Sequence, residues 1–198
     1  MNCYQKLSRL MFLPFVLQLL LPSWSMRAQS AVVPLRLEDS LPDVVGENLL
    51  GSPTHLLTVT TGKIAVVVFS FTNSGGKDAE LWNRELLRDF GSNRSVALSS
   101  VIMLESAPRF IRGFIVSGIR KDMPASLQSG AIVSYENEKL WKQRLAVTDD
   151  KHAYVLLLGR DSRIRWMNPG GFGDADYRKL ATEIQKQIQS AAEHAEMR

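Results

Sequence analysis

The hydrophobic pattern of the chain centres on residues 64–71, where the run Ile-Ala-Val-Val-Val-Phe-Ser-Phe is almost wholly apolar. A short run rich in β-branched and aromatic residues is typical of a strand buried on both faces of a sheet. A polar loop over residues 72–77 follows, and apolar positions at steps of three and four then predict a helix over residues 78–90. The order predicts a βα unit, and in an open α/β sheet a site lies at the carboxyl end of such a strand.

The pattern after this unit predicts a second strand within residues 96–104 and then another helix. Ser106 is expected to cap that helix, with Pro108 in its first turn. Four apolar residues are expected to form its buried side: Phe110, Ile111, Phe114 and Ile115. A small strand at residues 131–133 and a short helix at residues 137–145 complete the middle of the chain.

The last third of the chain predicts an antiparallel hairpin and a helix. Residues 153–158 and 164–167 are two apolar strands around a tight turn. Asp174 is expected to cap the final helix, whose stripe consists of Tyr177, Leu180, Ala181, Ile184 and Ile188. We therefore expect one α/β domain over residues 41–189, with an extended lead-in at 31–40, a short strand within 55–60 and a frayed tail at 190–198.

The first thirty residues have the pattern of a secretory signal. Lys6 and Arg9 precede an apolar stretch over residues 10–21, and Ala28-Gln29-Ser30 provides small residues for cleavage. The apolar stretch is shorter than the roughly 20 residues of a spanning helix, although a signal retained as an anchor stays open as an alternative. The sequence thus predicts export to the periplasm or the extracellular space, with no stable membrane span after cleavage.

Charge and cysteine content narrow the function classes. Removing Lys6, Arg9 and Arg27 from the 24 basic residues leaves 21 against 20 acidic residues, a net charge of +1. Nucleic-acid binding requires a concentrated basic surface, so we expect no nucleic-acid partner. Cys3 is the single cysteine and lies within the predicted signal. The mature chain would then have no disulfide, no Cys-x-x-Cys redox pair and no cysteine nucleophile.

The element order resembles the thioredoxin-like superfamily, which implies a three-layer α/β sandwich. In that fold a central mixed sheet with a C-terminal β-hairpin has helices on both faces. The redox branch places Cys-x-x-Cys where this chain has residues 72–77, and a cis-proline where it has Lys151-His152-Ala153. A closer resemblance, based on residues 153–158 and the following Ile164-Arg165-Trp166, is to the mitochondrial ATP synthase assembly factor family. It implies a binding or assembly role with a different client.

The candidate binding residues cluster around the loop after the central strand. Two glycines before a helix can present backbone N–H groups to an anion, helped by the helix dipole and Lys77. The candidate set is Thr72, Asn73, Ser74, Gly75, Gly76, Lys77, Arg109 and His152. The alternative is that the loop has a structural role only, as a turn in place of a lost redox motif. The three histidines have no metal-ligand spacing, so we expect neither a metal site nor a cofactor.

Two classes of function remain open on the sequence. The first is a non-catalytic, thioredoxin-like binding or assembly module of the cell envelope that acts on an envelope protein client. The second is a non-thiol enzyme or anion-ligand binder that uses residues 72–77. An exposed apolar patch would favour the first class, and a concave pocket lined by Lys77, Arg109 and His152 would favour the second.

Overall fold

The computed structural model describes residues 32–196; the predicted signal lies outside the described residues. The described strands are β1 (Val45–Asn48), β2 (Pro53–His55), β3 (Ile64–Ser70), β4 (Val96–Met103), β5 (Ala131–Ser134), β6 (Tyr154–Leu158) and β7 (Ile164–Asn168). The described helices are α1 (Leu56–Thr60), α2 (Asn73–Phe90), α3 (Arg109–Asp122), α4 (Ala125–Gln128), α5 (Glu138–Arg144) and α6 (Asp174–Glu196).

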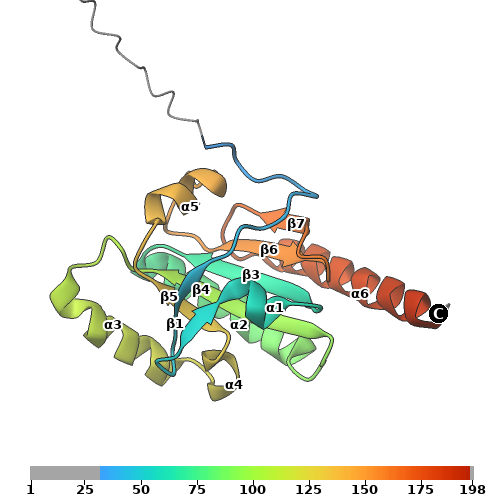
Figure 1. The fold of residues 1–198 in the computed structure, drawn as a ribbon, viewed down its shortest axis with the longest axis horizontal. Helices are drawn as coiled ribbons and strands as arrows, with labels where there is room; N and C mark the ends of the chain where they lie inside the picture. Colours follow the sequence, from blue (N-terminus) through green and yellow to red (C-terminus); the bar gives the residue numbers. More distant parts are fainter. Residues whose placement is uncertain (1–31, 197–198) are drawn as a thin grey trace, which may run out of the picture. The chain divides into compact units, whose positions relative to one another are not determined.

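The strands form one mixed sheet in the order β2-β1-β5-β4-β3-β6-β7 (Figure 1). Strand β3 pairs in parallel with β4 and antiparallel with β6, and all seven of its residues are buried. The predicted central strand, parallel neighbour and C-terminal hairpin are therefore confirmed. Alternate β3 residues serve opposite faces, so this strand contributes to the cores on both sides of the sheet.

Helices cover both faces of the sheet, as the fold class predicts. On one face, Trp82 and Leu86 of α2 pack with Leu180 and Ile184 of α6 over the even-numbered residues of β3. On the other face, Trp141 of α5 packs over the odd-numbered residues of β3 with α1 and the N-terminal segment. All hydrophobic clusters of the described chain lie within residues 35–188, so a protein that begins at Ala31 contains all of the core that the structure describes.

Two predicted elements in the first half of the described chain differ from the structure, and the lead-in makes contacts that were not predicted. Residues 55–60 are not a strand, because β2 ends at His55 and α1 follows it directly. Helix α2 begins at Asn73, so the predicted polar loop over 72–77 is wrong beyond Thr72. The segment before β1 docks on the domain: the Leu35 N–H bonds the Arg144 carbonyl, and Ser40 forms a bridge with Arg163.

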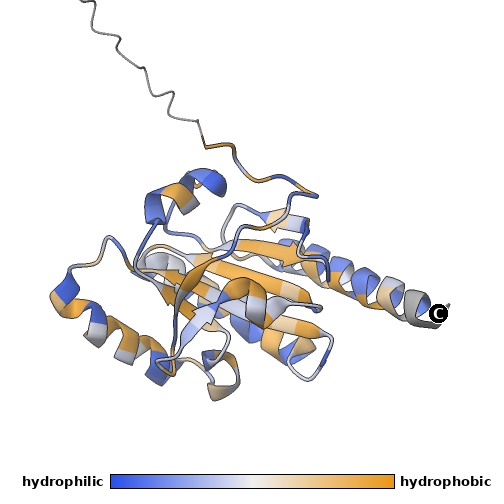
Figure 2. Ribbon diagram, viewed as in Figure 1, coloured by the Kyte–Doolittle hydropathy of each residue, from blue (hydrophilic) through white to orange (hydrophobic). Residues whose placement is uncertain are grey.

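Helix α3 buries only part of the predicted side: Ile111 and Ile115 are half-buried, whereas the prediction is wrong for Phe110 and Phe114. Phe110 and Phe114 are 88% and 84% exposed, and no residue of α3 is fully buried. The helix instead packs through the half-buried Val116 and Ile119, with Met123 just after it, against a small cluster on β4 and β5. Pro108, rather than Ser106, is the N-cap residue. The prediction failed because α3 carries apolar residues on more than one side, and Figure 2 shows hydrophobic and hydrophilic residues interspersed along it.

The C-terminal helix is longer than the sequence pattern predicts. Tyr177, Leu180 and Ile184 are buried, and Ala181 and Ile188 pack at the margin of the same cluster, which confirms the predicted stripe. However, α6 continues to Glu196. The helix therefore includes residues 190–196 of the predicted tail, whose fraying stays a prediction, while 197–198 lie outside the described residues.

Candidate functional site

Thr72 joins the carboxyl end of β3 to α2 and closes the start of that helix. It has extended backbone angles, and its Oγ1 accepts a hydrogen bond from the Gly75 N–H at 3.1 Å. The same hydroxyl donates to the Asp150 carbonyl at 2.7 Å. Thr72 is therefore an N-cap residue that also ties the helix to the chain segment before β6.

Gly75 allows this segment to approach the helix closely. A Cβ at Gly75 would lie 2.9 Å from the Asp150 carbonyl oxygen and 3.1 Å from that of His152. At neighbouring Gly76, a Cβ would have nothing within 4 Å. The two adjacent glycines thus differ in environment: the first is buried against backbone, and the second faces open space.

Asp78 is a connecting residue that the sequence analysis did not single out. Its carboxylate accepts the Ala153 N–H at 2.8 Å and the Phe172 N–H at 2.9 Å. One side chain of α2 therefore joins the helix to the start of β6 and to the loop that leads into α6. The only sequence signal was an acidic residue near the start of a helix, which the helix dipole favours without any further contact.

His152 lies beside this contact but is about half exposed. Its Nε2 is 3.8 Å from Oδ2 of Asp149, and its ring lies over Gly171, where a Cβ would come within 2.5 Å of Nδ1. The structure thus brings Thr72, Gly75 and His152 together. The side chains of Lys77 and Arg109 are exposed, and neither forms an ion pair or hydrogen bond with another described residue.

A second polar group near the same end of β3 was also missed. Lys142 of α5 forms ion pairs with Glu138 at 2.9 Å and Asp150 at 3.1 Å, and its ammonium lies over the Phe71 ring. Partial burial opposes the charged form, but the hydrogen bonds to Glu138 and Asp150 outweigh it and raise the pKa of Lys142. Glu138 is buried and also accepts the Ser106 N–H, so the group connects α5 to two loops.

These contacts define the chemistry that the start of α2 can support. The Gly75 N–H is bonded to Thr72 Oγ1, and the Gly76 N–H is bonded to the Thr72 carbonyl at 2.8 Å. Two carbonyl oxygens face Gly75, and both carry partial negative charge. Within residues 32–196 no three His, Cys, Asp or Glu side chains could hold a metal ion. The start of α2 is therefore occupied mainly by contacts within the protein.

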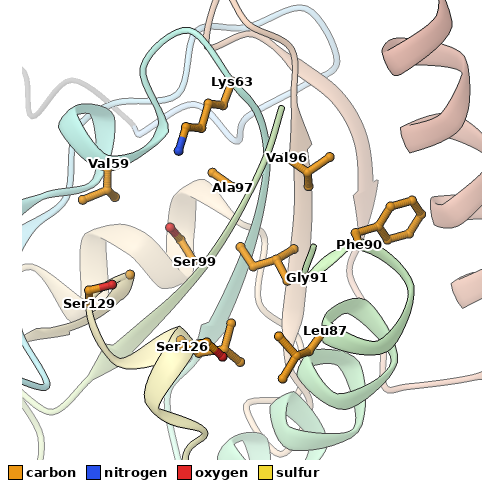
Figure 3. Close-up of a pocket in the computed structure, with 13 residues that line it drawn as sticks. Val59, Lys63, Leu87, Phe90, Gly91, Val96, Ala97, Ser99, Ser126 and Ser129 are labelled. Carbon is orange, nitrogen blue, oxygen red and sulfur yellow. The ribbon is translucent and has the colours of Figure 1, made fainter. Parts of the chain in front are cut away.

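A hollow of about 350 Å³ lies at the opposite end of the sheet (Figure 3). Its walls include Val59 of α1 and Leu87 of α2, with Ser99 of β4 and Ser126 of α4 on the other sides. The Lys63 ammonium points toward it from the residue before β3. Thr72 follows β3 whereas Lys63 precedes it, so this hollow is separate from the candidate residues predicted from the sequence.

A sequence model of the family described as ATP10 protein matches residues 37–186, which cover the sheet and nearly all the helices. The chain belongs to this family. The comparison with curated proteins returns no match.

The fold of this ATP10-family chain is similar to solved structures of thiol–disulfide proteins. A candidate thiol:disulfide interchange protein DsbE from Chlorobium tepidum has a TM-score of 0.57 at 14% identity, covering 79% of this chain and 98% of that protein. The thioredoxin domain of a thiol-disulfide oxidoreductase from Bacteroides vulgatus has a TM-score of 0.55 at 14% identity, covering 76% and 99%. The exposed lipoprotein thioredoxin of Streptococcus pneumoniae has a TM-score of 0.52 at 11% identity, covering 73% of this chain and 99% of that protein. At these identities the likeness shows the thioredoxin-like fold alone.

The ATP10-family chain departs from a thiol redox protein at the residues just described. Thr72 and the first turn of α2 stand where the redox branch of the superfamily has Cys-x-x-Cys, and Cys3 is the single cysteine of the whole sequence. Disulfide exchange requires a thiolate as the attacking group.

No helix of the described residues is long and apolar enough to cross a membrane.

Proposed function

We propose that this chain is a non-catalytic binding and assembly module that works in the cell envelope on a protein client. The thioredoxin-like fold and the membership of an assembly-factor family support the general role. The observation that carries the proposal is the closure of the former redox position, where Thr72, Gly75 and Asp78 are engaged with the segment before β6. Because these residues stabilise the fold, we expect the client to bind elsewhere on the outer surface of the domain.

The envelope location rests on the signal pattern of residues 1–30. The sequence predicts cleavage after Ser30, so the mature protein should begin at Ala31. N-terminal sequencing of the protein purified from its own cells tests this directly, together with fractionation into cytoplasm, periplasm and membrane. Recovery of the uncleaved chain in the cytoplasm would refute the envelope location without affecting the assembly role.

A client search combined with a redox assay tests the assembly role. The tagged mature chain is cross-linked in envelope extract, and the captured proteins are identified and quantified by mass spectrometry. We expect one envelope protein to be enriched in near-equal amounts and to re-form a complex with the purified chain. We expect no insulin reduction above the buffer control, because the thiolate is the nucleophile in that reaction. Insulin reduction by the mature chain would overturn the proposal.

The anion-binding alternative makes a different prediction. A ligand that binds only the native state raises the melting temperature by mass action. If residues 72–77 form an anion site, phosphate or sulfate should stabilise the mature chain, and Lys77→Ala should abolish the effect. Lys151→Ala provides a matched control, since Lys151 is also exposed and belongs to the neighbouring segment. We expect no Lys77-dependent stabilisation, because the Gly75 and Gly76 N–H groups already have partners.

A further inference from the structure

Helix α3 turns two aromatic rings toward solvent. Phe110 and Phe114 are four residues apart, so they lie on the same side of the helix, and both are more than four-fifths exposed. A Cβ added at Gly113 or Gly118 would meet nothing within 4 Å, so the outer side of the helix is open. Large apolar side chains grouped on an exposed face mark an interaction site.

Three cations accompany these rings. Arg109, Arg120 and Lys121 are exposed, and their side chains form no ion pair or hydrogen bond with other described residues. At about 100° per residue, Lys121 lies nearly in line with Phe110, while Arg109 and Arg120 share a stripe roughly a quarter turn away. Arg112 differs from them, because it donates to the Glu105 and Ala107 carbonyls.

The charge of this face is of one sign. Asp122 is the single acidic residue within α3, and it lies roughly a third of a turn from the line of Phe110 and Lys121. The outer side of α3 therefore combines aromatic rings along its centre with free cations on that line and along one flank. Basic helices with aromatic residues on the apolar side are typical of binding in the headgroup region of a membrane.

We propose that the outer face of α3, defined as Phe110, Phe114, Arg109, Arg120 and Lys121, docks on the surface of an anionic lipid bilayer. The two rings enter the boundary between headgroups and acyl chains, and the cations contact lipid phosphates. Arginine and lysine can extend along the helix to reach the phosphate level while the rings lie deeper. This inference goes beyond the proposed assembly role and does not depend on the identity of the client.

Two other occupants fit this face less well. A second copy of the chain would bring two sets of free cations together, and like charges across an interface oppose association. An acidic protein would satisfy the cations but would also need a groove shaped for two protruding rings. A fluid bilayer accepts both rings without a preformed cavity, and Figure 1 shows α3 as a separate rod at the margin of the sheet.

Vesicle binding of the chain that begins at Ala31 tests the proposal. Sedimentation with extruded vesicles compares phosphatidylcholine alone with mixtures that contain phosphatidylglycerol. Phe110→Ser/Phe114→Ser removes the rings, and Arg109→Gln/Arg120→Gln/Lys121→Gln removes the cations. Matched controls elsewhere are Val33→Ser/Leu37→Ser, which are 67% and 57% exposed, and the exposed cations Arg94, Lys151 and Arg160 changed to Gln.

We expect binding to the anionic vesicles, little binding to phosphatidylcholine, and weakening by salt because screening reduces attraction between exposed charges. Each α3 variant should lose about tenfold or more in apparent affinity, while the matched controls change by less than about twofold. A Phe110→Trp variant should gain blue-shifted emission when anionic vesicles are added. The proposal is overturned if the parent protein does not bind, or if the α3 variants bind as well as their controls. Binding to a soluble acidic protein without binding to vesicles overturns it as well.

Discussion

The pair Gly75 and Gly76 offers a direct test of the closed site, because the same substitution should have opposite effects at neighbouring positions. Replacing glycine by alanine within a helix usually stabilises a protein by about 0.4–1 kcal/mol. Gly76→Ala should show this gain, since its new methyl group has free space. Gly75→Ala places a methyl group 2.9 Å from a backbone carbonyl, so the segment from Asp150 to His152 must move.

The size of the Gly75 effect follows from the contacts that this movement disturbs. Overpacking typically costs about 1–3 kcal/mol, and weakening the bond from the Thr72 hydroxyl to the Asp150 carbonyl adds up to about 1 kcal/mol. The helix gain offsets up to about 1 kcal/mol, so the net loss should be about 1–3 kcal/mol. Gly76→Ala is thus a matched control with the opposite sign.

Urea unfolding of the two variants and the parent protein, each beginning at Ala31, measures the difference. The midpoint should fall for Gly75→Ala and rise slightly for Gly76→Ala, with unchanged slopes. In thermal unfolding, a loss of 1 kcal/mol corresponds to about 2–4 °C for a domain of this size. If both alanine variants were equally stable or more stable than the parent, the close approach between α2 and the segment before β6 would be refuted.

Three further predictions concern side chains that hold α2, α5 and α6. Ile184→Ala should lower the free energy of unfolding by about 2–5 kcal/mol, because Ile184 of α6 is buried. Ile188 lies at the margin of the same cluster, so Ile188→Ala should lower it clearly less. Equal urea midpoints for the two variants would contradict the docking of α6. Asp78→Ala leaves two backbone N–H groups without their acceptor, so it should lower the free energy of unfolding by about 2–4 kcal/mol. The urea midpoint again measures the change, and an unchanged midpoint would refute the connecting role of Asp78. The raised pKa of Lys142 means that its contribution is complete below its ordinary value of 10.5 and is lost as pH rises through the higher folded value. Lys142→Met should therefore flatten the alkaline fall in stability, and a fall as steep as in the parent would count against the Glu138–Lys142–Asp150 group.

The sheet was predictable because its strands carry strong local signals. Residues 64–70 are buried on both faces of the sheet, and their nearly continuous apolar run indicates a central strand. The hairpin of β6 and β7 was equally clear, because a tight turn separates two apolar strands. In both cases the hydrophobic pattern and the turn residues indicate the same structure.

The start of α2 and the orientation of α3 depend on tertiary contacts that a local pattern does not contain. Gly75 and Gly76 resemble a turn, yet both lie in the first turn of α2, and the reason for glycine at position 75 is the close approach of the Asp150 carbonyl. On α3, the stripe through Phe110 and Phe114 and the side through Val116 and Ile119 are both apolar. The small cluster on β4 and β5 determines which side is buried, and that cluster also needs Leu49 from a distant segment.

The replacement of the redox motif has a structural consequence that bears on function. In a thiol protein of this fold, the first turn of the helix after the central strand must stay accessible, because a thiolate there has to meet a disulfide. In this chain the N-cap residue Thr72 is bonded to the segment before β6, and Asp78, in the second turn of α2, is bonded to the start of β6. A substrate that displaced this segment from the helix would break these hydrogen bonds and leave partly buried backbone groups unpaired, which costs up to about 1–3 kcal/mol for each group. The exposed rings and free cations of α3 therefore provide a more accessible contact surface than the position at which related folds carry out their chemistry.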